Sequence, residues 1–291
     1  MRTTALLDWS RGLAGPMRSI SSREGERDMH YAYAVTRAES LPAVFEGGQK
    51  LTDAITGYLV WLQTLGEVEE PRGIVFHDFD SATTIFSTHV LPAWTDHELI
   101  HIDPLVGDWR HIYLSALTEG LSPSIQTLIR SYYDSLNYSD VATILAHELT
   151  HHLRVFAEVP EDATWFEEGF CFYAPRKQLL PADRLRELQS VEKALIDAHG
   201  ERLGGHPIWQ FGRSDTGGGF TDALFDYWRA IHAVSTLIDT YAHGDSKSIL
   251  ALFSRWKNQS DRATRLDEFL IAALEVSEMD QRQVWLLSGI A

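Results

Sequence analysis

The sequence lacks most features that would tie the chain to a membrane or cross-link it covalently. Cys171 is the single cysteine, which rules out a disulfide within the chain. No apolar run approaches the roughly 20 residues of a membrane-spanning helix. Residues 1–30 also lack the apolar stretch that forms the centre of a signal peptide. We therefore expect a cytoplasmic protein with no membrane partner. The Cys171 thiol is expected to pack in the core rather than to act in catalysis or to bind a metal.

Basic residues are scarce relative to acidic ones. The 291 residues include 25 Lys and Arg against 41 Asp and Glu, which gives a formal net charge of -16 at pH 7. Such a surface repels polyanions, so we expect no nucleic acid as a partner. Hydrophobic residues make up 44% of the chain, which is enough for a sizeable core.

The first half of the chain is expected to form a small mixed β-sheet with one long helix. Residues 1–30 are rich in Arg, Ser, Gly and Glu and are interpreted as an N-terminal extension. Helical spacing of apolar residues predicts a helix over Gln49–Thr64. Apolar runs predict strands at Tyr31–Val35, Gly73–Phe79, Ala82–Ser87, Glu98–Ile102 and Arg110–Ser115.

The second half is expected to be mainly helical. The spacing of apolar residues predicts helices within 118–138, around 140–153, over 181–199, over 227–244 and in three short stretches after residue 246. A glycine-rich loop is expected over 204–220. The predicted class is therefore α+β, with a small mixed β-sheet lobe over 31–136 and a mainly helical lobe over 137–291. We expect the two lobes to form one domain.

The strongest chemical signal is the motif His147-Glu148-Leu149-Thr150-His151. On a helix, His147 and His151 lie one turn apart, so both imidazoles project from one face and can bind one metal ion. Glu148 lies beside them, within reach of a metal-bound water. The pattern is short, and an ordinary polar helix face would also produce it.

The residues around the motif favour a buried helix. Leu145, Leu149 and Leu153 form an apolar stripe roughly opposite the two histidines. Ser139 or Asp140 can cap the start of this helix. One face of the helix would thus be covered while the other presents the two imidazoles.

A catalytic zinc ion usually has three protein ligands, and Trp165-Phe166-Glu167-Glu168-Gly169-Phe170 offers the third. With the His-Glu-x-x-His motif, it resembles the gluzincin metallopeptidases of the thermolysin and aminopeptidase N type, especially the peptidase MA-like group. In that group the Glu before the Gly binds the metal, which implies Glu168 rather than Glu167. The alternative is a solvated helix start, where negative charge is favoured in any case.

The resemblance extends to the helix that begins near Tyr227. It implies that Tyr227 occupies the position of the tyrosine that stabilises the tetrahedral intermediate, with His232 as the competing donor. The family's Lys-Gly after that tyrosine is replaced here by Arg229-Ala230. A buried structural tyrosine is the alternative interpretation of Tyr227.

The implied protein is a zincin-like metallopeptidase with its active site between the two lobes. It would bind one catalytic zinc ion through His147, His151 and Glu168, and would cleave a peptide or protein substrate by a metal-activated water, with Glu148 as general base. Two other functions stay open: an inactive or structural zinc-binding relative that binds peptides, and a zinc hydrolase acting on a non-peptide amide.

Three further details bear on the implied site. In gluzincins an edge strand just before the metal-site helix pairs with extended substrate, and His111–Ser115 is assigned to it, with an ordinary central strand as the alternative. Where thermolysin-type sites have an aspartate four residues after the ligand glutamate, this chain has Phe172. The group that orients His147 is therefore unassigned, and His152 is expected to point away from the metal.

Overall fold

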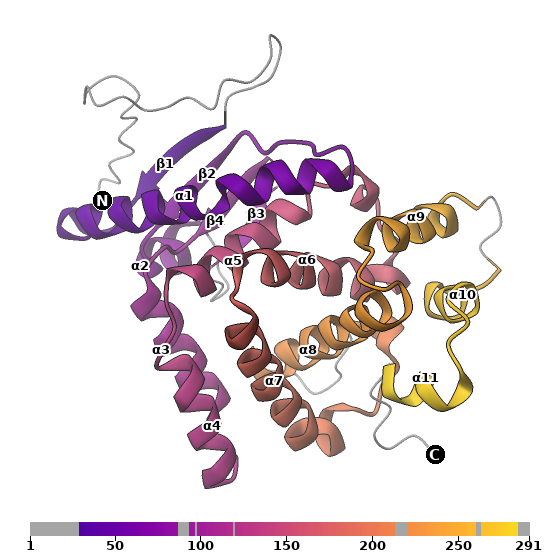
Figure 1. Ribbon diagram of the computed structural model, residues 1–291. Coiled ribbons are helices and arrows are strands. Elements are labelled where there is room, and N and C mark those ends of the chain that lie inside the picture. The colour runs from indigo at the N-terminus through magenta and orange to yellow at the C-terminus, as the bar shows by residue number, and fades with distance from the viewer. Residues whose placement is uncertain are drawn as a thin grey trace.

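The computed structural model of this chain describes residues 29–86, 93–96, 98–118, 120–212, 220–259 and 263–284. It confirms the α+β class, because a small mixed sheet is combined with a mainly helical remainder. Figure 1 shows the sheet with helix α1 at one end of the molecule, α5 and α6 in the middle, and α9 to α11 on the side away from α2 to α4.

The sheet has four described strands in the order β1-β2-β4-β3. They are β1 (His30–Ala34), β2 (Gly73–His77), β3 (Ala93–Asp96) and β4 (Leu99–Ile102). β1, β2 and β4 are parallel, whereas β3 runs antiparallel to β4, with Ala93 opposite Ile102 and Asp96 opposite Leu99. Every residue of β2 is buried, as expected for a central parallel strand. β3 therefore lies at an edge of the sheet.

Two of the predicted strands are wrong. Arg110–Ser115 lies inside helix α3 (Val106–Leu117), where Trp109, Tyr113 and Leu117 recur every four residues and pack into the core. This moves the edge strand of the sheet from His111–Ser115 to β3.

The other wrong strand is Ala82–Ser87. The Asp78 side chain accepts a hydrogen bond from the Ser81 amide at 2.9 Å, which starts helix α2 (Phe79–Ser81). The following residues, Ala82–Phe86, continue as a π-helical turn, and Ser87 lies outside the described residues.

Helix α1 (Leu41–Leu65) is longer than the predicted Gln49–Thr64 and covers one face of the sheet. It comes close to β2, since a Cβ atom on Gly48 would lie 2.8 Å from the Phe76 ring. Farther along α1, the Tyr58 hydroxyl is hydrogen-bonded to that of Thr150 on α5. This helix therefore connects the sheet to the helical half.

The predicted helices of the second half are present as far as the structure describes them. The described residues leave out 213–219 of the glycine-rich loop, 285–287 of the final helix predicted over Gln283–Leu287, and 1–28 of the N-terminal extension. His30, which was assigned to that extension, belongs to β1. The helices are α4 (Pro123–Tyr133), α5 (Tyr138–Thr150), α6 (Thr164–Leu179), α7 (Ala182–Leu203), α8 (Phe220–Thr236), α9 (Ser246–Lys257), α10 (Leu266–Ala273) and α11 (Glu278–Val284).

One continuous hydrophobic core runs from Val44 on α1 to Val284 at the end of α11. The sheet lobe and the helical lobe therefore share their buried side chains. None of the helices in the described part of the chain has both the length and the apolarity to cross a membrane.

The buried His77 at the end of β2 should make the fold sensitive to acid. Burial, and then the nearby His101, lower the pKa of His77 from 6.5 to about 4. Between these two values the unfolded chain binds a proton that the folded protein excludes, so the free energy of unfolding should fall as the pH falls.

We expect His77→Phe to retain the ring packing on Trp94, 5.3 Å away between centroids, and to remove this pH dependence. At about pH 4.5 the variant should be more stable than the native protein by roughly 1–3 kcal/mol. Urea unfolding at neutral and acidic pH measures the difference. The same pH dependence in both proteins would contradict the assignment.

Candidate metal centre

Helix α5 is fixed at its start by a capping box. Asn137, rather than the predicted Ser139 or Asp140, is the N-cap and accepts a hydrogen bond from the Ser139 amide. The Asp140 side chain accepts in return from the Asn137 amide at 2.9 Å, and Arg184 forms an ion pair with Asp140 at 3.0 Å. These contacts set the rotation of α5 about its axis.

On α5, Leu145 and Leu149 of the predicted leucine stripe are fully buried. Leu153 is buried as well, but it lies beyond the end of the helix and has an extended backbone. On the other face, His147 and His151 come together, with their Nε2 atoms 3.2 Å apart. His151 follows the last residue of the helix but keeps a helical backbone, with φ -58 and ψ -23. The one-turn relation between the two rings therefore holds.

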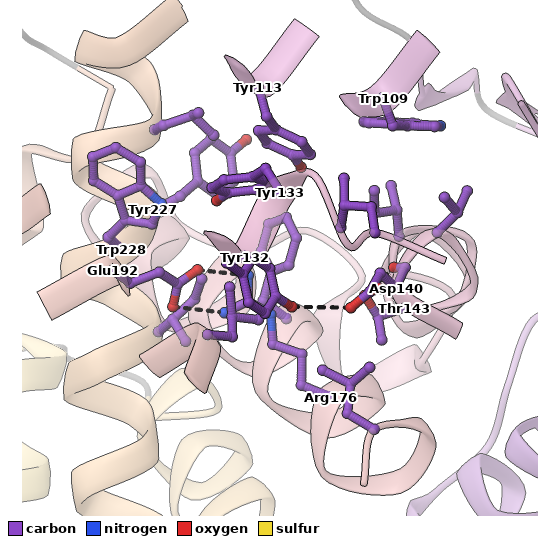
Figure 2. A pocket seen from close by; sticks show the side chains of 18 residues that line it. Trp109, Tyr113, Tyr132, Tyr133, Asp140, Thr143, Arg176, Glu192, Tyr227 and Trp228 are labelled. Atoms are coloured by element: carbon purple, nitrogen blue, oxygen red, sulfur yellow. Dashed lines mark hydrogen bonds and ion pairs between the residues drawn. The ribbon is translucent and has the colours of Figure 1, made fainter. Parts of the chain in front are cut away.

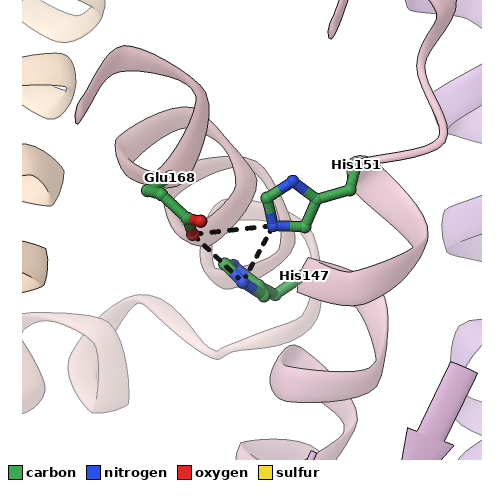
Figure 3. A group of neighbouring side chains, drawn as sticks. All are labelled: His147, His151 and Glu168. Atoms are coloured by element: carbon green, nitrogen blue, oxygen red, sulfur yellow. Dashed lines mark hydrogen bonds and ion pairs between the residues drawn. The ribbon is translucent and has the colours of Figure 1, made fainter. Parts of the chain in front are cut away.

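Helix α6 brings Glu168 to the same point. The Glu168 Oε2 atom lies 3.5 Å from the Nε2 atoms of both His147 and His151, and Figure 3 shows the resulting triangle between two facing helices. Gly169 makes the packing behind it possible, since a Cβ atom there would lie 2.5 Å from the Ala230 carbonyl oxygen of α8. The Glu-Gly pair thus combines a ligand with a close helix contact.

The three donor atoms have the spacing of a zinc site. Tetrahedral bonds of about 2.0–2.1 Å place neighbouring ligand atoms about 3.3–3.4 Å apart. The observed separations are 3.2, 3.5 and 3.5 Å. The spacing of His147, His151 and Glu168 is therefore compatible with one bound zinc ion, and these three side chains form the group of possible metal ligands found among the described residues.

Glu167 orients one of the imidazoles. Its Oε1 atom lies 2.8 Å from His151 Nδ1, which places the proton on Nδ1 and leaves Nε2 to face Glu168. Burial alone would lower the pKa of His151, but the neighbouring carboxylates of Glu168 and Glu167 favour the charged ring, and the pKa is raised above 6.5.

His147 is held by ring packing instead. The Phe172 ring lies 3.8 Å from the His147 ring between centroids. The Nδ1 atom of His147 is buried without a hydrogen bond of standard geometry, although the adjacent backbone of Cys171 acts to raise its pKa. Burial, then His151 and Arg176, lower the pKa of His147 well below 6.5, which keeps the ring neutral as a metal ligand must be.

Glu148 lies beside the triangle and is not part of it. It is 8% exposed, and its Oε2 atom accepts a hydrogen bond from the Thr95 hydroxyl of β3 at 2.6 Å. Burial raises the pKa of Glu148, opposed by His151 and the Thr95 hydrogen bond. A raised pKa suits a carboxylate that must take up a proton near neutral pH.

Tyr227 lies beside this cluster, close enough for the charge of Glu168 to affect its pKa. His232 follows five residues later on α8, about 140° around the helix from Tyr227. The Tyr227 ring packs edge-on against Phe172 at 5.6 Å. Burial, and then the charge of Glu168, raise the pKa of Tyr227, so its hydroxyl keeps its proton and can donate a hydrogen bond.

Three functional neighbours were missed from the sequence: Thr95, Glu167 in its orienting role, and Phe172 as the packing partner of His147. An acid beside a ligand glutamate is a signal that could have indicated Glu167, but nothing local indicates Thr95. Cys171 is buried as predicted, and burial raises the pKa of its thiol to about 12. His152, the residue after His151, is half-buried and does not belong to the group of possible ligands. Its backbone carbonyl accepts a hydrogen bond from the Glu69 amide.

Comparison with protein-family models, curated proteins and solved structures finds no match to this chain. The chemistry of the site must therefore be inferred from its own geometry.

Proposed function

We propose that this protein is a zinc-dependent metallopeptidase. The observation that carries the proposal is the triangle of His147, His151 and Glu168 donor atoms with a buried carboxylate, Glu148, beside it. Two imidazoles and one carboxylate suit zinc, and three protein ligands are typical of a catalytic site, whereas structural sites usually have four. The described residues offer three ligands at this position.

Each residue then has a role. A bound zinc ion would supply Lewis-acid activation of a water and of the substrate carbonyl. Glu148 takes the proton from that water and passes it to the leaving amine, while the Thr95 hydroxyl holds the carboxylate in place. Tyr227 donates a hydrogen bond to the oxygen on which negative charge develops.

The edge strand offers a way to hold an extended peptide. Thr95 is part of β3, so the residue that contacts Glu148 belongs to the antiparallel edge strand of the sheet. An extended chain can pair with such an edge through backbone hydrogen bonds. This favours a peptide over other amides, and gives β3 the role first assigned to His111–Ser115.

Removal and return of zinc test this function. We expect the zinc-loaded protein to cleave members of a mixed peptide library, the chelator-treated protein to cleave none, and added zinc to restore the same products. Mass spectrometry of the digest identifies the cleaved bonds. Products that are unchanged by chelation, with the zinc shown to be gone, would overturn the proposal.

A further inference from the structure

The helices behind the metal centre are held to one another by polar contacts. A small cavity of about 50 Å³ beside Phe172 lies among α3, α4, α5, α6, α7 and α8. Figure 2 shows its lining, in which Arg176 on α6 forms an ion pair with Glu192 on α7 at 2.9 Å. In the same lining, Tyr132 on α4 donates a hydrogen bond to Asp140 on α5 at 2.9 Å. Four of the six helices are therefore tied together on this side.

The sheet side of the site depends on a short strand. β3 has four residues and, among the described strands, pairs with β4 alone. It nevertheless carries Thr95, whose hydroxyl donates a hydrogen bond to Glu148 Oε2 at 2.6 Å. An edge strand has ladder hydrogen bonds on one side only. The position of the Thr95 hydroxyl therefore depends on what else packs against β3.

Trp94, the residue before Thr95, points to the opposite face of the sheet. Successive side chains of a strand alternate between the two faces, and the pairing puts Trp94 opposite His101 and Thr95 opposite Ile100. The indole of Trp94 lies parallel to the His101 ring, with 4.6 Å between the ring centroids and 3° between the ring planes. The strand is thus anchored on the face that is turned away from α5.

The same indole also reaches the central strand. The His77 ring of β2 lies 5.3 Å from the Trp94 ring and 5.9 Å from the His101 ring between centroids. These three rings, of His77, Trp94 and His101, form the ring stack, and Phe86 from the turn after α2 packs on it 5.2 Å from His101. Burial lowers the pKa of His77 to about 4, so this ring is uncharged at neutral pH. The ring stack therefore connects β3 to β2 across β4.

We propose that Trp94 is a positioning residue for the catalytic base. Its packing in the ring stack fixes β3, so that the Thr95 hydroxyl meets the Glu148 carboxylate. Trp94 and Glu148 lie on opposite sides of the sheet, so the effect of Trp94 on the reaction passes through Thr95. The inference rests on the proposed peptidase function.

Trp94→Ala should reduce kcat on a peptide that the native protein cleaves by about 10²-fold, the scale expected for a shift of about 1 Å at the reacting groups. Trp94→Phe keeps a flat ring on His101 and should recover most of this loss. Zinc affinity, measured by competition with a chelator, should stay at the native value in both variants, because the ligands lie on α5 and α6. A fall in zinc affinity parallel to the fall in kcat would indicate general loss of structure and contradict the assignment.

Phe45→Ala is the matched control. It removes an aromatic contact, 5.0 Å from Tyr33 between centroids, at the other edge strand of the sheet, β1. The contact is of the same kind as the one that Trp94→Ala removes, but β1 carries no residue of the proposed site. Phe45→Ala should therefore keep native kcat, and an equal loss of kcat in Phe45→Ala would overturn the proposal.

A double-mutant cycle tests whether Trp94 acts through Thr95. Thr95→Val removes the hydroxyl with little change in shape, so it should lower kcat by itself. In that background Trp94→Ala should lower kcat by less than about threefold further, whereas independent sites would show the full effect again. A full second loss would overturn the proposal. If Trp94→Ala does not fold by circular dichroism, His77→Ala breaks the same ring stack and is compared in the same cycle with His77→Phe, which keeps it.

Crystal structures of the native and Trp94→Ala proteins separate this inference from the proposed function. We expect the distance between Thr95 Oγ1 and Glu148 Oε2 to exceed about 3.5 Å in the variant, so that the hydrogen bond is lost. If the native protein cleaves no peptide and this hydrogen bond is lost in Trp94→Ala, the positioning role stands and the peptidase function fails. A hydrogen bond that is retained in Trp94→Ala overturns the positioning role, with or without peptide cleavage by the native protein.

Discussion

Replacing Glu148 with glutamine is expected to abolish peptide hydrolysis while zinc stays bound. Glutamine has nearly the same shape as glutamate, and its amide oxygen can still accept the hydrogen bond from Thr95 that Glu148 Oε2 accepts at 2.6 Å. It cannot take a proton from water near neutral pH. We expect a loss of kcat of at least about 10²–10⁴, the range that general acid-base catalysis supplies.

The experiment compares kcat on one cleaved peptide with the zinc content of the same sample. Glu46→Gln, on an exposed part of α1, is a matched control and should keep full activity. Because Glu148 lies outside the ligand triangle, the zinc content of Glu148→Gln should equal that of the native protein. Full activity in Glu148→Gln would show that another group accepts the proton.

Alanine at Glu168 should remove the bound zinc, whereas alanine at Glu167 should weaken its binding. Glu168 Oε2 is one of the three donor atoms, so Glu168→Ala leaves two imidazoles, too few for a stable site. Glu167 contacts His151 Nδ1 at 2.8 Å, on the side of the ring away from the metal position. Loss of such an orienting partner typically costs about 10- to 100-fold in metal affinity.

Competition with a zinc chelator measures both dissociation constants. The two adjacent glutamates are a matched pair, since each substitution removes the same atoms from the same helix. A second measurement is the rise in thermal stability on adding zinc, which is about 2.7 kcal/mol at a zinc concentration of 100 times the dissociation constant. Equal zinc affinity in native and Glu168→Ala proteins would rule out Glu168 as a ligand.

Local patterns predicted most elements of the fold. Apolar spacing predicts the long helix α1, strands β1, β2 and β4, and the helices of the second half. An element with one buried face repeats its apolar residues with the period of a helix or of a strand. The segment in α3 was misassigned because a short apolar run, His111–Ser115, suits a strand as well as a helix. Its helical state depends on where Trp109, Tyr113 and Leu117 find partners in the core.

The residues of the candidate site also fall into two groups, those that the sequence indicates and those that only the fold brings to the site. His147, Glu148 and His151 could be recognised from the sequence because a helix places residues four apart on one face, whatever surrounds it. Thr95 could not be, since it lies 53 residues from Glu148 and reaches it only through the position of β3 at the sheet edge. The cavity beside Phe172 likewise exists only where six helices meet.

The sequence by itself determined a helix with two imidazoles and a carboxylate on one side and leucines on the other. That outcome needs only helical periodicity. Tertiary structure decided which of Glu167 and Glu168 points at the two imidazoles, because the rotation of α6 is set by its close contact with α8 at Gly169. It also decided which group orients each imidazole and which hydroxyl holds Glu148, since those contacts join segments that only the packed core brings together.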